Sequence, residues 1–201
     1  MRQITFSVVA DGGTDRALLP VLTWAIHRLD PDVEILEPGF VKRRGSVKEC
    51  LSGLVTGAQL VFVHRDAESE SLEARLREFE EVERDDVVPV IPVRMTEAWL
   101  LIDGAAIARA AGHPSVELKL PSVAALERLP DPKGTLEELL LQAAGDPTGR
   151  RRKKFLASLA ERRVNVAEFV RNFSPLEKLE AFVRFQRTLS ARYPYREQLR
   201  R

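Results

Sequence analysis

Short apolar runs alternate with amphipathic segments along the first half of the chain. Apolar and β-branched residues predict strands at positions 4–9, 33–36, 60–63 and 87–93. After these runs, apolar residues recur at helical spacing, which predicts helices that cover the strands. This order is typical of an α/β fold, a Rossmann-like and mainly parallel sheet flanked by helices. Pro89 and Pro92 indicate that the last strand lies at an edge or is bulged.

The pattern changes to an all-helical one from about Gly112. Two capping boxes, at Thr135 and Ser174, predict helix starts there. We therefore expect an α/β domain over residues 1–111 and a C-terminal helical extension over residues 112–201 that packs on it. The boundary rests on composition, and these helices could simply pack back on the sheet.

Acidic residues follow three of the predicted strands. They are Asp11 and Asp15 after the first, Asp66 and Glu68 after the strand at 60–63, and Glu97 after the last. The carboxyl ends of adjacent parallel strands meet at one edge of a sheet, where open α/β sheets bind ligands. Gathered carboxylates repel one another unless a cation neutralises them, and Mg²⁺ prefers oxygen ligands. The sequence therefore predicts a site for Mg²⁺ (or Mn²⁺); the alternative for residues 66–70 is an acidic turn that stabilises the next helix.

Features that suit a phosphate group lie beside the first acidic cluster. Gly12 and Gly13 let the backbone approach a ligand closely, and Thr14 opens a helix N-terminus that favours anions. Lys133 is a further candidate for a phosphate contact, although a turn before a helix explains it equally well. Carboxylates next to such a backbone are suited to metal-assisted phosphodiester chemistry.

Three motifs in this order resemble a known family. The segment from Asp11 to Asp15 is similar to the Glu-Gly-x-Thr-Asp/Glu start of TOPRIM (topoisomerase–primase) domains of the OLD nuclease type. Asp66-Ala67-Glu68 resembles their Asp-x-Asp pair. The segment from Glu97 to Asp103 resembles the Glu-Ala-Trp-Leu-Leu-x-Asp motif of a TOPRIM-like family, domain of unknown function 4276.

The resemblance implies a TOPRIM-like core, Mg²⁺ binding and action on nucleic acid, with a role in phage defence beside an ATPase partner. By position, Asp66 and Glu68 would hold the metal. Asp11 would stand in place of the family's Glu, as a ligand or as the general acid/base, and Asp15 and Glu97 would complete a two-metal site. Asp11 is one methylene shorter than the family's residue, and Glu68 is one longer.

The charge is strongly asymmetric, although the net charge of the chain is only +1. Residues 1–149 contain 16 basic and 25 acidic residues, a net charge of −9, whereas residues 150–201 contain 15 and 5, a net charge of +10. Such a basic tail suits a polyanionic partner, and it equally suits attraction between two halves of one fold. The expected contacts to nucleic-acid phosphates are Lys42, Arg43 and Arg44 on a loop or edge hairpin and the run Arg150, Arg151, Arg152, Lys153 and Lys154.

Cysteine content, hydropathy and histidine positions limit the cellular compartment and the kind of metal site that we expect. One cysteine, Cys50, excludes an intramolecular disulfide, and no apolar run approaches the roughly 20 residues of a membrane helix. We expect a cytoplasmic protein with no membrane partner. The three histidines are too scattered for a zinc site; His64 adjoins the predicted metal site and could assist proton transfer or simply be packed.

The leading hypothesis is a Mg²⁺-dependent TOPRIM-like nuclease or nuclease subunit. The alternative is a non-catalytic TOPRIM-like adaptor or binding module that partners an ATPase. A phosphatase or nucleotidyl-transfer enzyme is a third possibility, and the basic tail argues against it. DNA and RNA remain open as substrates, and a homodimer remains open as the oligomeric state.

Overall fold

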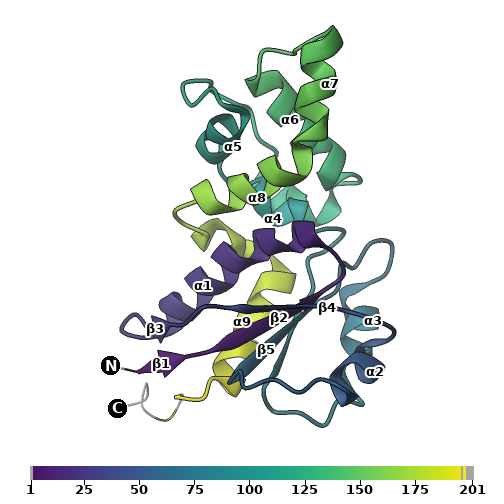
Figure 1. Ribbon diagram of the computed structural model, residues 1–201, viewed down its shortest axis with the longest axis vertical. Helices are drawn as coiled ribbons and strands as arrows, with labels where there is room; N and C mark the ends of the chain where they lie inside the picture. The colour runs from purple at the N-terminus through teal and green to yellow at the C-terminus, as the bar shows by residue number, and fades with distance from the viewer. Residues whose placement is uncertain (1, 196, 198–201) are drawn as a thin grey trace.

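Four parallel strands form the sheet around which the chain is arranged. The computed structural model describes residues 2–195 and 197. The strands are β2 (Phe6–Ala10), β4 (Gly39–Lys42), β5 (Leu60–His64) and β6 (Val87–Val90), in the order β4-β2-β5-β6 (Figure 1). The predicted α/β class with a parallel sheet and flanking helices is thus confirmed.

The two inner strands are buried along their whole length. All residues of β2 and β5 are buried, and Val8 stands beside Phe62, which stands beside Val88 on the next strand. Apolar side chains on both faces make this possible, as expected for a parallel sheet covered on both sides. β6 is an edge strand, so Pro89, which cannot donate to a ladder, is tolerated there as predicted.

Two details of the strands differ from the prediction. The first predicted strand is divided at Thr5 into β1 (Gln3–Ile4) and β2, and β1 pairs in parallel with β3 (Glu34–Ile35). The segment expected to be a loop or hairpin contains β4, which pairs in parallel with β2 and forms the other edge of the sheet. Its pairing partner precedes it by about 30 residues, so local sequence could not reveal it.

Helices cover both faces of the sheet. α1 (Leu18–Leu29) and α9 (Glu180–Arg192) pack on the face that carries Phe6 and Phe62. α2 (Val47–Ser52) packs on the opposite face with the segment that follows α3 (Leu72–Arg77). Side chains alternate between faces along each strand, which is why neighbouring residues of β5 belong to different apolar clusters.

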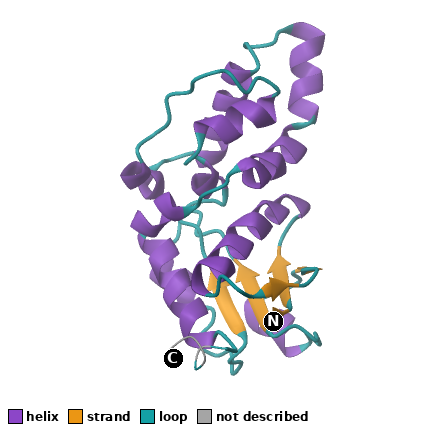
Figure 2. Ribbon diagram, turned by 90° about the vertical axis from the view of Figure 1, so that its left-hand side faces the viewer, coloured by secondary structure: helices purple, strands orange, loops and turns teal. Residues whose placement is uncertain are grey.

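The remaining helices form an extension beyond the carboxyl ends of the strands (Figures 1 and 2). They are α4 (Glu97–Leu100), α5 (Gly104–Ala111), α6 (Pro132–Ala143), α7 (Gly149–Ala157) and α8 (Leu159–Phe169), with short 3-10 helices η2 (Val123–Arg128) and η3 (Ser174–Lys178). In the part of the chain that the structure describes, none of the helices combines the length and the apolar character needed to span a bilayer.

The extension shares its hydrophobic core with the sheet. Phe185 of α9 lies with its ring centroid 6.1 Å from that of Phe62 on β5, and Phe182 lies 5.1 Å from Trp99 on α4. One apolar cluster joins residues of β2, β5, α1, α4, α6, α8 and α9. The helices after Gly112 therefore share one apolar core with the sheet, and α9 among them packs on its face.

Both predicted capping boxes are wrong. α6 begins at Pro132, and the Asp131 side chain accepts a hydrogen bond from the Gly134 backbone N–H at 2.8 Å. Ser174 begins η3 without capping it through its side chain, and α9 begins six residues later. A 3-10 turn, η1 (Gly13–Ala17), precedes α1, so Pro20 lies in the first turn of α1, where proline is tolerated.

Candidate functional site

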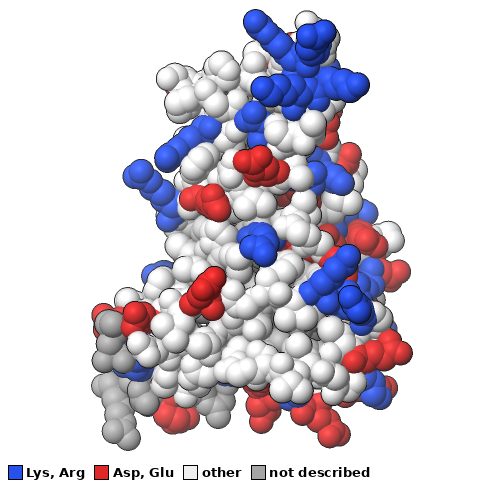
Figure 3. Space-filling view, in the orientation of Figure 1, with Lys and Arg blue, Asp and Glu red and all other residues white. Residues whose placement is uncertain are grey.

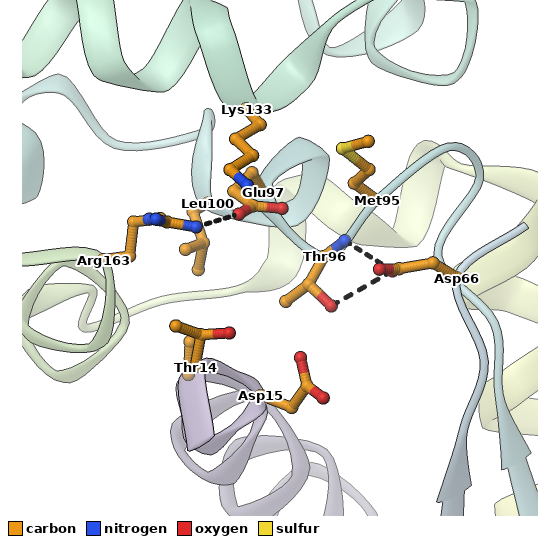
Figure 4. Close-up of a pocket in the computed structure, with 10 residues that line it drawn as sticks. Thr14, Asp15, Asp66, Met95, Thr96, Glu97, Leu100, Lys133 and Arg163 are labelled. Carbon is orange, nitrogen blue, oxygen red and sulfur yellow. Dashed lines mark hydrogen bonds and ion pairs between the residues drawn. The ribbon is translucent and has the colours of Figure 1, made fainter. Parts of the chain in front are cut away.

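The candidate site lies where the connections of the sheet change direction. From β2 the chain crosses to β4 on one side, and from β4 it crosses to β5 on the other side of β2. The carboxyl ends of two such neighbouring strands leave a crevice between the loops that follow them. A pocket of about 160 Å³ occupies this position (Figure 4), and its polar lining includes Asp15, Asp66, Thr96, Glu97, Lys133 and Arg163.

Asp15 is fixed by the turn after β2. Its Oδ2 accepts a hydrogen bond from the Gly12 backbone N–H at 2.8 Å, which holds the side chain at the start of η1. Only 13% of the side chain is exposed. Burial raises the pKa of this carboxyl, but the facing His64 and the Gly12 N–H lower it more, so the pKa of Asp15 lies below its usual value.

Asp66 is held by Thr96 and His64 on the opposite side of the pocket. The Thr96 backbone N–H donates to Asp66 Oδ1 at 2.8 Å, and the Thr96 hydroxyl lies 3.3 Å from the same oxygen. His64 Nε2 lies 3.0 Å from Asp66 Oδ1 and 3.0 Å from Thr96 Oγ1. All the hydrogen bonds that Asp66 makes with described residues fall on Oδ1, which leaves Oδ2 for the pocket.

His64 stands between the two carboxylates. It is the last residue of β5 and only 2% exposed, and its Nδ1 lies 3.6 Å from Asp15 Oδ2 without a hydrogen-bond partner among the described residues. Burial lowers the pKa of the imidazole, but Asp15 and Asp66 outweigh burial and raise the pKa to about 9. At neutral pH a buried imidazolium therefore neutralises part of the charge of these two carboxylates.

Basic side chains from the extension complete the pocket. Arg163 of α8 donates from Nη1 to Glu97 Oε1 at 2.8 Å, and both side chains are less than one-fifth exposed. Lys133, at the start of α6, reaches the same pocket from above (Figure 4). The pocket thus combines acidic groups that suit a cation with basic groups that suit an anion.

Two of the five predicted metal ligands lie outside this pocket. Asp11 is half-exposed, and its carboxylate pairs with Arg43 at 2.6 Å and Arg65 at 3.6 Å. Glu68 has a left-handed backbone, with φ of 54°, and its carboxylate lies 3.6 Å from Arg75 Nη2. Of the predicted set, the pocket brings together Asp15, Asp66 and Glu97.

A ready-made metal cluster is not found in the described residues. No group of three or more His, Cys, Asp or Glu side chains there is arranged to hold a metal ion. Glu97 is engaged by Arg163, and the imidazolium of His64 occupies the space between Asp15 and Asp66. A cation at this site would be held first by Asp15 and Asp66.

The predicted nucleic-acid contacts lie on two separate surfaces. Lys42 and Arg44 are exposed at the end of β4, whereas Arg43 between them is turned toward Asp11. The cations of α7 lie at the tip of the extension, at the top of Figure 3, and every one is exposed; they are Arg150, Arg151, Arg152, Lys153 and Lys154. Ion pairs between these five and other described residues are absent.

Two important site residues had no sequence signal of their own. Thr96 directly precedes Glu97, and nothing in the sequence indicates that it donates a hydrogen bond to Asp66. Arg163 lies 66 residues after Glu97, so only the tertiary fold brings the two together. For His64 the sequence allowed either a role in proton transfer or simple packing. The side chain is packed, and it also lies between the carboxylates of Asp15 and Asp66.

Comparisons with known proteins found no match, so any family assignment rests on the sequence motifs. No family model matches the sequence, no curated protein matches it, and no solved structure matches the fold. The resemblance of the three motifs to TOPRIM domains therefore stays a prediction.

Proposed function

We propose that this pocket is the active site of a TOPRIM-like, divalent-metal-dependent nuclease or nuclease subunit. One observation carries the proposal. Asp15 and Asp66 line a single pocket at the carboxyl ends of two adjacent parallel strands, and Asp66 Oδ2 is left unbonded by the described residues that hold the side chain.

The donor set suits Mg²⁺ or Mn²⁺. Both ions take carboxylate oxygens, and Mg²⁺ commonly binds through one or two carboxylates and keeps several waters. Asp15 and Asp66 would hold the ion, and Glu97 would join them if Arg163 turned to a substrate. A bound ion would activate water and stabilise the leaving oxygen of a phosphodiester. If His64 lost its proton, the negative charge of Asp15 and Asp66 would no longer be partly neutralised by the imidazolium and could be neutralised by the metal ion.

The rest of the lining suits the phosphate. Lys133 and Arg163 supply positive charge, and Thr14, in the first turn of η1, lines the same pocket as Asp15. The exposed cations of α7 and of the β4 end favour a long polyanion over a small ester, because a small ester needs no extended basic surface. These features support nucleic acid as the substrate.

Cleavage of supercoiled plasmid and single-stranded nucleic acid with Mg²⁺ or Mn²⁺ tests the proposal. Asp66→Asn removes the metal-binding charge while keeping the side-chain shape, so cleavage should fall at least about 100-fold. Asp85→Asn, an exposed substitution before β6 at the opposite end of the sheet, is the matched control and should leave cleavage unchanged. Cleavage that is independent of metal, or equal in Asp66→Asn and the control, would refute the proposal.

A second candidate is the non-catalytic binding module that partners an ATPase. The specific observation in its favour is that protein groups already hold the carboxylates, since Asp66 Oδ1 accepts from Thr96 and His64 and Glu97 pairs with Arg163. Calorimetric titration with Mg²⁺ and Mn²⁺ separates the two. Salt-sensitive nucleic-acid binding without metal binding or cleavage would favour the module.

A further inference from the structure

A row of arginines and carboxylates lies along the rim of the sheet beside the pocket. Arg43 contacts Asp11, Asp11 contacts Arg65, and Arg65 contacts Glu78. From Glu78 the row continues through Arg75 to Glu68. The predicted site residues Asp11 and Glu68 thus belong to one ion-pair row, in which Arg43 is at one end and Glu68 at the other.

The arginines of this row are fixed. Arg43 and Arg65 follow β4 and β5 directly, and their side chains are only 14% and 18% exposed. Arg65 donates from Nε to Glu78 Oε2 at 2.8 Å and from Nη2 to Oε1 at 3.3 Å. Arg43 donates to the Gly45 carbonyl, and its buried Nε has no hydrogen-bond partner among the described residues. Contacts other than those with Asp11 therefore also hold the two guanidinium groups in place.

The carboxylate between them is the more exposed partner. Asp11 is 51% exposed, and its carboxylate lies 2.6 Å from Arg43 but 3.6 Å from Arg65. An ion pair to an exposed carboxylate contributes little to stability, because water and salt screen it, so its replacement by another anion costs little. Glu78 differs, because it is 29% exposed and binds both Arg65 and Arg75 at short range. Glu78 is thus the structural counter-ion of the row, and Asp11 is the exchangeable one.

We propose that Arg43 and Arg65 form a phosphate-binding subsite that Asp11 occupies in the free protein. A phosphate of the nucleic-acid backbone displaces the Asp11 carboxylate and binds the two guanidinium groups, whose planar forks match phosphate oxygens. The exposed neighbours Lys42 and Arg44 attract the same strand. Asp11 then acts as a resident counter-ion that weakens non-productive binding, and not as a metal ligand. The choice of nucleic acid as the source of the phosphate rests on the proposed function.

Binding without metal tests the subsite separately from cleavage. Fluorescence anisotropy of a labelled DNA duplex in EDTA gives the Kd of the wild type, Asp11→Asn and Asp85→Asn. Removing the competing carboxylate should tighten binding about threefold to tenfold in Asp11→Asn. Asp85→Asn makes the same change in net charge far from the row and should change the Kd less than about twofold. The gain should vanish in the double variant Asp11→Asn/Arg65→Gln.

The outcomes separate this subsite from other roles of Asp11. If folded Asp11→Asn binds the duplex no more tightly than the wild type, the proposal is overturned. If Mg²⁺-dependent cleavage is lost as well, Asp11 acts in catalysis or metal binding instead. If thermal melting shows that Asp11→Asn is not folded, Asp11→Ser and Arg43→Lys replace it. Asp11→Ser should tighten binding of the duplex, and Arg43→Lys should weaken it. Stabilisation of Asp11→Asn by inorganic phosphate with no gain for the duplex would overturn the nucleic-acid source. Tightening without any cleavage would leave the subsite standing and refute the nuclease.

Discussion

His64 connects the two carboxylates of the pocket through opposite edges of one imidazole ring. Nε2 lies 3.0 Å from Asp66 Oδ1 and Nδ1 lies 3.6 Å from Asp15 Oδ2. A buried cation between two anions keeps both charges in place without any metal ion. Protonation of His64 therefore contributes to the free energy of unfolding.

The stability of the metal-free protein should depend on pH through His64. The folded protein keeps the His64 proton up to about pH 9, whereas the unfolded chain releases it above about pH 6.5. The contribution is thus complete below pH 6.5 and lost as the pH rises to 9. In EDTA, the free energy of unfolding should fall by up to about 1.4 kcal/mol per pH unit between these values.

Urea unfolding at several pH values measures this slope. His64→Gln has no titrating ring, so it should lose the His64 part of the slope while Asp15 and Asp66 remain. His27→Gln is the control, because the His27 ring is exposed, lies within hydrogen-bond distance of the Val33 carbonyl and pairs with no carboxylate among the described residues, so it should keep the slope. Equal slopes in the wild type and His64→Gln would contradict the prediction.

The strands were predictable because their signals are local. β2 and β5 are continuous apolar runs, and acidic residues that follow them were correctly expected near the carboxyl rim. The helix starts were less predictable, because Asp131 and not Thr135 caps α6. The directions taken by Asp11 and Glu68 depend on Arg43, Arg65 and Arg75. These arginines carry no spacing signal that links them to either carboxylate.

The helix α7 should contribute most of the salt dependence of nucleic-acid binding. Replacing all five of its cations by Gln should lower the slope of log K against log salt by up to about 4.5, from about 0.9 per phosphate contact. Cations near a helix N-terminus oppose the helix dipole, so the variant should be at least as stable as the wild type.

Anisotropy titrations at several salt concentrations measure this slope. Replacing only Arg150, Arg151 and Arg152 by Lys keeps the charge and should leave the slope unchanged. An unchanged slope in the Gln variant would show that α7 lies outside the contact surface.

Charge attraction between the two parts of the chain is present but limited. Arg163 pairs with Glu97 and Arg184 pairs with Glu73, so basic residues of the tail do contact the acidic body. The five cations of α7 have no such partners among the described residues. The attraction of the halves therefore explains part of the asymmetry, but it does not explain the cations at the tip of the extension.

The two ends of the described chain meet at one buried carboxylate. Asp30, which is 0% exposed, accepts hydrogen bonds from Arg2 Nε at 2.8 Å and from the Tyr193 hydroxyl at 3.0 Å. The hydrogen bond from Arg2 lowers the pKa of Asp30, and it outweighs the effect of burial. This contact fastens the segment after α9 to the C-terminal end of α1.

Tyr193→Phe should destabilise the fold by removing one hydrogen bond to this carboxylate. The expected cost is about 1.5 kcal/mol, which corresponds to a Tm lower by about 3–6 °C for a chain of this size. Differential scanning calorimetry checks the value. Tyr195→Phe removes hydrogen bonds with two neutral groups, the Gln3 carbonyl and the Gln59 side-chain amide, at a less buried position, and should cost less. An equal or larger loss in Tyr195→Phe would contradict the role given to Asp30.

The helix α6 acts as a spacer between the pocket and the tip of the extension. Lys133 in its first turn lines the pocket, and its 12 residues span about 18 Å before the chain turns into α7. Successive phosphates of one DNA strand are about 3.4 Å apart along the helix axis. A strand that fills the pocket and also reaches the tip must therefore be more than about five nucleotides long. If the proposed function holds, a dinucleotide is too short to reach both places, so the protein would distinguish its substrates by length before it reads any base.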